Sequence, residues 1–137
     1  MAAAKKVARP RKQKVVAAPA ETSAWMVAAQ AAEAKKAENV RLLDLQGLTS
    51  FTDYLVLCTG TNPRQVQAIA DGVELQLKNA GERPKSVEGY NNAEWILLDY
   101  GDYVVNVFSE QARTYYDLDR LWQDAAEVLR GATQAEG

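Results

Sequence analysis

One segment constrains the fold more than any other: YLVLCTGTNP, residues 54–63. Residues 54–59 are apolar without polar alternation, the pattern of a β-strand that is covered on both faces. A helix start follows at once, because Thr61 or Asn62 can cap a helix and Pro63 suits its first position. A strand covered on both faces and followed by a helix predicts an α/β domain with helices flanking the sheet.

The rest of the chain supplies the other elements of such a domain. An alanine-rich helix is predicted at 21–38 with Thr22 or Ser23 as its cap, and a strand at 39–48 that Gly47 closes. Apolar residues at three- and four-residue spacings predict a helix from Pro63 to Gly81. A loop (82–92), a hairpin (94–108) that turns at Gly101 and a helical region (110–130) follow. The prediction is a single compact α/β domain over residues 21–130, with a mixed β-sheet.

Charge divides the chain into a basic arm and an acidic body. Residues 1–20 carry six basic side chains and no acidic one, whereas the other 117 residues carry ten basic and eighteen acidic groups. The arm has no apolar periodicity, so residues 1–20 and the tail 131–137 are predicted to be disordered. The arm would add weak, salt-sensitive contacts to RNA, including rRNA.

Composition also limits the compartment. No apolar run approaches the ~20 residues that span a bilayer, so we expect no membrane association. The single cysteine, Cys58, lies in an apolar run and is predicted to be buried and unpaired, which indicates a reducing, cytoplasmic compartment.

Residues suited to catalysis are scarce. The chain has no histidine and one cysteine, which argues against a zinc site and removes the commonest general base. The acids of DLD, residues 117–119, have the spacing of a metal-binding pair, but they fall at a predicted helix start, where acids favour the helix dipole. We therefore expect no enzyme, metal or cofactor. Two alternatives stay open: a nucleotide-using enzyme with a degenerate site around TGTN (59–62), and an RNA-binding protein that depends on the arm.

Three blocks of sequence resemble the ribosomal silencing factor family, also called Iojap: GLTSFTDYLVLCTGTNPRQVQAIAD (47–71), VEGYNNAEWILLDYGDYVVNVF (87–108) and YYDLDRLW (115–122). The resemblance implies a minimal nucleotidyltransferase-like fold without catalytic residues. It also implies binding to the large ribosomal subunit through universal ribosomal protein fourteen, which blocks joining of the small subunit and represses translation when nutrients are scarce. The free protein would be a monomer or a homodimer.

Within the hairpin, period two places Trp95, Leu97 and Asp99 on one face of the sheet and Ile96 and Leu98 on the other. The first face combines an aromatic and an acid, which suits a partner surface, although a buried core position is the alternative for Trp95. The family usually has histidine where this chain has Asn106, so a role that depends on protonation is excluded there. The expected partner-binding residues are an apolar anchor, three acids and three polar rim residues: Trp95; Glu88, Asp99 and Asp102; Tyr90, Tyr100 and Asn106.

Overall fold

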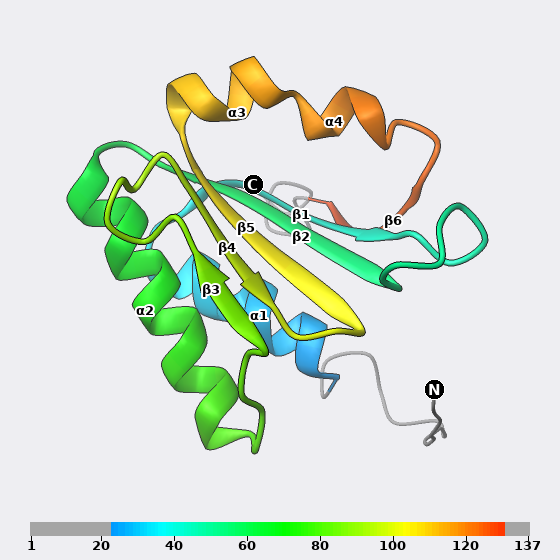
Figure 1. Ribbon diagram of the computed structural model, residues 1–137, viewed down its shortest axis with the longest axis horizontal. Coiled ribbons are helices and arrows are strands. Elements are labelled where there is room, and N and C mark those ends of the chain that lie inside the picture. The colour runs from blue at the N-terminus through cyan, green and yellow to red at the C-terminus, as the bar shows by residue number, and fades with distance from the viewer. Residues whose placement is uncertain (1–22, 131–137) are drawn as a thin grey trace.

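A mixed six-stranded sheet forms the centre of the computed structural model, which describes residues 23–130 (Figure 1). The predicted arm, residues 1–20, and tail, residues 131–137, lie outside the described residues. The strand order is β3-β4-β5-β2-β1-β6. The strands are Glu38–Asp44 (β1), Tyr54–Gly60 (β2), Ser86–Glu88 (β3), Trp95–Asp99 (β4), Tyr103–Ser109 (β5) and Ala126–Arg130 (β6). The helices are Ala24–Ala34 (α1), Pro63–Asn79 (α2), Glu110–Tyr116 (α3) and Leu118–Leu121 (α4).

The parallel pair β2 and β5 occupies the middle of the sheet, and the other neighbouring strands are antiparallel. This confirms the predicted α/β domain with a mixed sheet. Helices α1 and α2 cover one face, and α3 and α4 lie over the other (Figure 1). β2 alternates between the two cores, with Val56 and Cys58 toward α1 and α2 and with Leu55 and Leu57 toward α3 and α4. Cys58 is fully buried, as predicted, and burial raises the pKa of its thiol to about 12.

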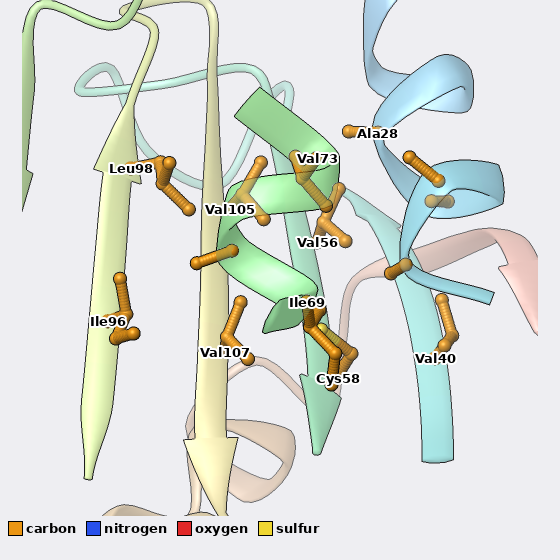
Figure 2. Packing of buried hydrophobic residues seen from close by; sticks show 14 of the residues in the cluster. Ala28, Val40, Val56, Cys58, Ile69, Val73, Ile96, Leu98, Val105 and Val107 are labelled. Atoms are coloured by element: carbon orange, nitrogen blue, oxygen red, sulfur yellow. The ribbon is translucent and has the colours of Figure 1, made fainter. Parts of the chain in front are cut away.

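Helix α2 begins as its sequence predicts. The Asn62 side chain accepts a hydrogen bond from the Gln65 backbone N–H at 2.8 Å, and Pro63 is the first helical residue. Figure 2 shows Ile69 and Val73 of α2 packed among apolar side chains of the sheet. Full burial of such a side chain contributes ~1.5–3 kcal/mol, so this layer is a main source of stability.

Strand β3 lies where the sequence predicts only a loop, residues 82–92. Ser86, Val87 and Glu88 pair antiparallel with Asp99, Leu98 and Leu97. All three β3 residues are exposed. A strand of three exposed residues has no apolar pattern, so only its pairing with β4 reveals it.

The helix predicted over 110–130 is wrong beyond Leu121. Asp117 adopts a φ of 49°, a left-handed conformation that ends α3, and the chain then forms the short α4 and the strand β6. β6 pairs antiparallel with β1. The chain forms a strand here because the outer edge of β1 has backbone N–H and C=O groups that need hydrogen-bond partners.

Ion pairs fasten α3 and α4 to the sheet. Asp119 accepts hydrogen bonds from Arg113 Nε at 2.7 Å and from Arg41 Nη1 of β1 at 2.6 Å. Arg41 Nε also donates to Glu127 of β6 at 2.8 Å, and Arg113 Nη1 donates to the Thr59 hydroxyl at 2.8 Å. The hydrogen bonds from the guanidinium groups, Arg113 first, lower the pKa of Asp119 to about 2. The Asp119 carboxylate therefore has a structural role, and the described residues hold no group of three or more His, Cys, Asp or Glu suited to a metal.

Candidate protein-docking surface

The hairpin strand β4 borders a part of the sheet that the helices leave open. Ile96 and Leu98 are fully buried beneath α1 and α2, whereas Trp95, Leu97 and Asp99 are half-buried on the face that carries α3 and α4. The period-two prediction for this strand is confirmed. On that face α3 packs against β5 and β2, so β4 lies at the margin of the helical cover.

Two ring contacts and one hydrogen bond fix the Trp95 side chain. Its indole ring lies 5.2 Å from the ring of Phe108 on β5 and 4.6 Å from the ring of Tyr116 on α3, centroid to centroid. Its Nε1 donates a hydrogen bond to Asn106 Oδ1 at 2.9 Å. Trp95 is therefore neither a core residue nor a free surface residue. It lies at the edge of the core between the sheet and helices α3 and α4, and the rest of its ring is at the surface.

The segment that leads into β4 sets the position of Trp95. Gly89 has a φ of 80°, and a Cβ there would overlap the Trp95 carbonyl oxygen, so only glycine fits. The Ser109 backbone N–H and hydroxyl donate to the backbone and the side-chain carboxylate of Glu94, both at 2.9 Å. These contacts tie the start of β4 to the end of β5, immediately beside the tryptophan.

Two tyrosines extend the apolar surface along α3. Tyr116 is 47% exposed and Tyr115 is 81% exposed, and their rings form an edge-to-face pair at 4.9 Å. We call Trp95, Leu97, Tyr115 and Tyr116 the aromatic surface. Sequence patterns alone do not single out the two tyrosines. The only sequence feature that points to them is the YY pair in the third family block. That these tyrosines lie beside Trp95 depends on how α3 folds back over the sheet.

Acidic side chains lie beside the aromatic surface. Glu88 is exposed and is the cross-strand neighbour of Leu97, on the same face. Asp99 lies four residues along β4 from Trp95, ~13 Å away at the usual strand rise. Its carboxylate accepts a hydrogen bond from the Gly101 N–H at 2.8 Å, so it also stabilises the hairpin turn, where Asp102 is exposed.

The three expected rim residues lie elsewhere. Asn106 is 1% exposed and lies beneath Trp95, and Tyr100 is 8% exposed with its ring stacked on Tyr103 on the α1–α2 side. Both belong to the interior rather than to an exposed rim. Tyr90 is exposed, but its hydroxyl donates to Asp71 of α2 at 3.0 Å, which places it at the α2 side of the molecule. Tyr90 and Tyr100 lie in the connections on either side of β4, whereas alternation along β5 puts the polar Asn106 into the core.

Side chains bond two of the backbone amides around TGTN. The Thr61 N–H donates to Gln65 Oε1 at 2.6 Å, and the Gln65 N–H donates to Asn62 Oδ1 at 2.8 Å. Gln65 Nε2 in turn donates to the carbonyl of Lys36 at 3.1 Å. Side chains thus occupy two of the amides that a phosphate could use at this helix start, which weakens the nucleotide-using alternative.

A family model described as "Ribosomal silencing factor during starvation" matches residues 18–136. The chain belongs to the ribosomal silencing factor family. The resemblance of the three sequence blocks is thereby confirmed. The ribosomal silencing factor of Bacillus subtilis is 41% identical over 105 residues, which cover 77% of this chain and 89% of that protein. The Iojap-related mitochondrial protein of Arabidopsis thaliana is 34% identical over 92 residues, which cover 64% of this chain and 50% of that protein.

Solved structures agree with the silencing factor fold. A crystal structure of a Chromobacterium violaceum protein superposes with a TM-score of 0.71 at 35% identity and covers 80% of this chain and 92% of that one. A Bacillus halodurans structure gives a TM-score of 0.64 at 41% identity, with 70% and 90% coverage. Across residues 23–130, none of the helices combines the length and the apolar character that crossing a membrane requires.

Proposed function

We propose that this protein binds the large ribosomal subunit through its aromatic surface and blocks joining of the small subunit, which represses translation when nutrients are scarce. The observation that carries the proposal is Trp95, fixed between Phe108 and Tyr116 at the open margin of the sheet. Family membership supports the ribosome as the partner.

The chemistry of the surface suits a basic protein partner. Aromatic side chains supply large, rigid contact areas and are enriched at protein interfaces. Glu88 beside them, and Asp102 at the hairpin turn, would meet lysine or arginine, and complementary charge speeds association. Universal ribosomal protein fourteen is the partner that the family resemblance implies, and we adopt it as part of the proposal.

The mechanism is steric exclusion and needs no catalytic group. A protein that occupies the contact face of one subunit prevents the other from reaching it, whatever the chemistry of the bound surface. Silencing would then depend on the affinity for the free subunit and on the amount of protein.

Sedimentation tests this function directly. The full-length protein should co-sediment with purified large subunits and not with joined ribosomes. Trp95→Ala should weaken binding roughly thirtyfold, because truncating an interface tryptophan often costs ~2 kcal/mol or more. Denaturant unfolding of the variant separates lost docking from lost folding. Equal binding to joined ribosomes would rule out steric exclusion.

A further inference from the structure

A buried amide lies under the proposed docking anchor. Asn106 is 1% exposed, and it is on the central strand β5 between β4 and β2. Its Oδ1 accepts a hydrogen bond from Trp95 Nε1 at 2.9 Å, and its Nδ2 donates to the Val56 carbonyl of β2 at 3.3 Å. One side chain thereby connects the indole of β4 to the backbone of β2.

The two partners fix the orientation of this amide. The indole N–H only donates and the carbonyl only accepts, so the oxygen of Asn106 must face Trp95 and its nitrogen must face Val56. A flipped amide would place donor against donor and acceptor against acceptor. The bond to β2 therefore holds the acceptor in one place, and the acceptor in turn selects one orientation of the indole ring.

The orientation of the ring decides what Trp95 presents to a partner. Nε1 is the only polar atom of the indole, and it is already bonded inside the chain. Every other ring atom is carbon, so the exposed part of the ring is purely apolar. A partner would contact it with aliphatic groups or with a cation over the ring face, and not with a hydrogen-bond acceptor.

We infer that Asn106 is a positioning residue for docking, which turns the polar edge of Trp95 inward and leaves a fixed apolar anchor at the surface. The inference rests on the proposed function for its effect on binding. The orientation of the ring itself is a property of the free protein and can be measured without a ribosome.

Nuclear magnetic resonance of the full-length protein tests the orientation. The chain has three tryptophans and so three indole N–H signals, of which Trp95→Phe identifies the one from Trp95. That signal should exchange slowly with water in the wild type and quickly in Asn106→Leu, which is similar in volume and cannot accept the bond. Equally fast exchange in both proteins would overturn the inference.

Affinity for purified large subunits tests the effect on docking. Asn106→Leu should lower affinity by up to roughly tenfold, because this is the loss in affinity that corresponds to the usual contribution of one hydrogen bond. It should cause no further loss in a Trp95→Phe background, because the donor is then absent. Val105→Ala is the matched control, since Val105 is a fully buried neighbour on the same strand that faces the opposite core. It should lower the unfolding midpoint and leave affinity unchanged.

The outcomes separate the two proposals. An equal loss from Asn106→Leu in both backgrounds, or no loss in the wild-type background, would show that Asn106 does not act through Trp95. Failure of the wild-type protein to bind large subunits would overturn the proposed function together with the docking role. Indole exchange would still decide whether Asn106 orients the ring.

Discussion

At the level of single residues, side chains that we propose for docking also contribute to the folded core. Trp95 packs on Phe108 and Tyr116 and bonds to Asn106, and it still reaches the surface. Period two predicts its face correctly from the sequence. The bond to Asn106 could not be predicted in this way, because it depends on the pairing of Leu97 with Asn106 across β4 and β5.

Two acids on this face should behave differently when their charge is reversed. Glu88→Lys should slow association with a basic partner and leave stability within ~0.5 kcal/mol, because Glu88 is exposed. Asp99→Lys should also lose ~1 kcal/mol of folding stability, since the Asp99 carboxylate accepts the bond from the Gly101 N–H. Association rate constants and denaturant midpoints check both variants. If Glu88→Lys associated as fast as the wild type, this face would not be the one that meets a basic partner.

At the scale of elements, the C-terminal region shows where sequence patterns stop being sufficient. Leu118 and Trp122 pack against the core beneath α3 and α4. Leu121 is 64% exposed, and residues 126–130 form β6 instead of continuing the predicted helix. Local periodicity cannot reveal β6, because its cause is the unpaired edge of a strand some 85 residues earlier in the chain.

The ion pairs at α4 should make stability depend on pH in the acid range. The pKa of Asp119 is lower in the folded protein than its usual value, so the unfolded chain binds the proton more tightly. The stabilisation is complete above about pH 4 and is lost as pH falls through about 2, and it amounts to at most about 2 kcal/mol at this partly exposed site.

Asp119→Asn should therefore be less stable than the wild type at pH 7, and the difference in unfolding free energy should shrink between pH 4 and pH 2. Urea unfolding across this range is the measurement, with Asp124→Asn as the control at an exposed acid of the same segment. A difference that stays constant down to pH 2 would contradict a lowered pKa for Asp119.

Two glycines test the packing between elements. A Cβ at Gly60, the end of β2, would lie 2.9 Å from the backbone nitrogen of Val66, which cannot move without shifting α2. Gly60→Ala should therefore cost ~1–3 kcal/mol. A Cβ at Gly72 would meet only the flexible stem of Lys35, and alanine favours a helix interior by ~0.5–1 kcal/mol, so Gly72→Ala should be nearly neutral. Thermal unfolding distinguishes them, and equal midpoints would contradict the packing described for Gly60.

At the scale of the whole molecule, the sequence predicts the class of fold and the family but only part of the surface. The central strand, the capped helix and the hairpin have strong local signals, so they are found correctly. The proposed docking surface combines residues of β3, β4 and α3, which local signals do not bring together. Sequence patterns miss Tyr115 and Tyr116 for this reason, and they place Tyr100 at a rim although it is buried.

The basic arm should modulate binding without supporting the fold. Deleting residues 1–20 removes six positive charges. The unfolding midpoint should hardly change, whereas ribosome affinity should weaken modestly and lose part of its salt dependence. Titrations at several salt concentrations measure this. Complete loss of binding would favour the alternative in which the arm is the main RNA-binding determinant.

A subunit-joining assay tests the proposed steric exclusion directly. Separated subunits are mixed under joining conditions, and the fraction of joined ribosomes is measured against the concentration of added protein. Tyr116→Ala removes an exposed ring from the aromatic surface, and Leu75→Ala removes a similarly exposed side chain from α2 on the opposite side, at 47% and 55% exposure. The wild type and Leu75→Ala should block joining equally, and Tyr116→Ala should require roughly tenfold more protein. Equal inhibition by all three proteins would show that the aromatic surface is not what keeps the subunits apart.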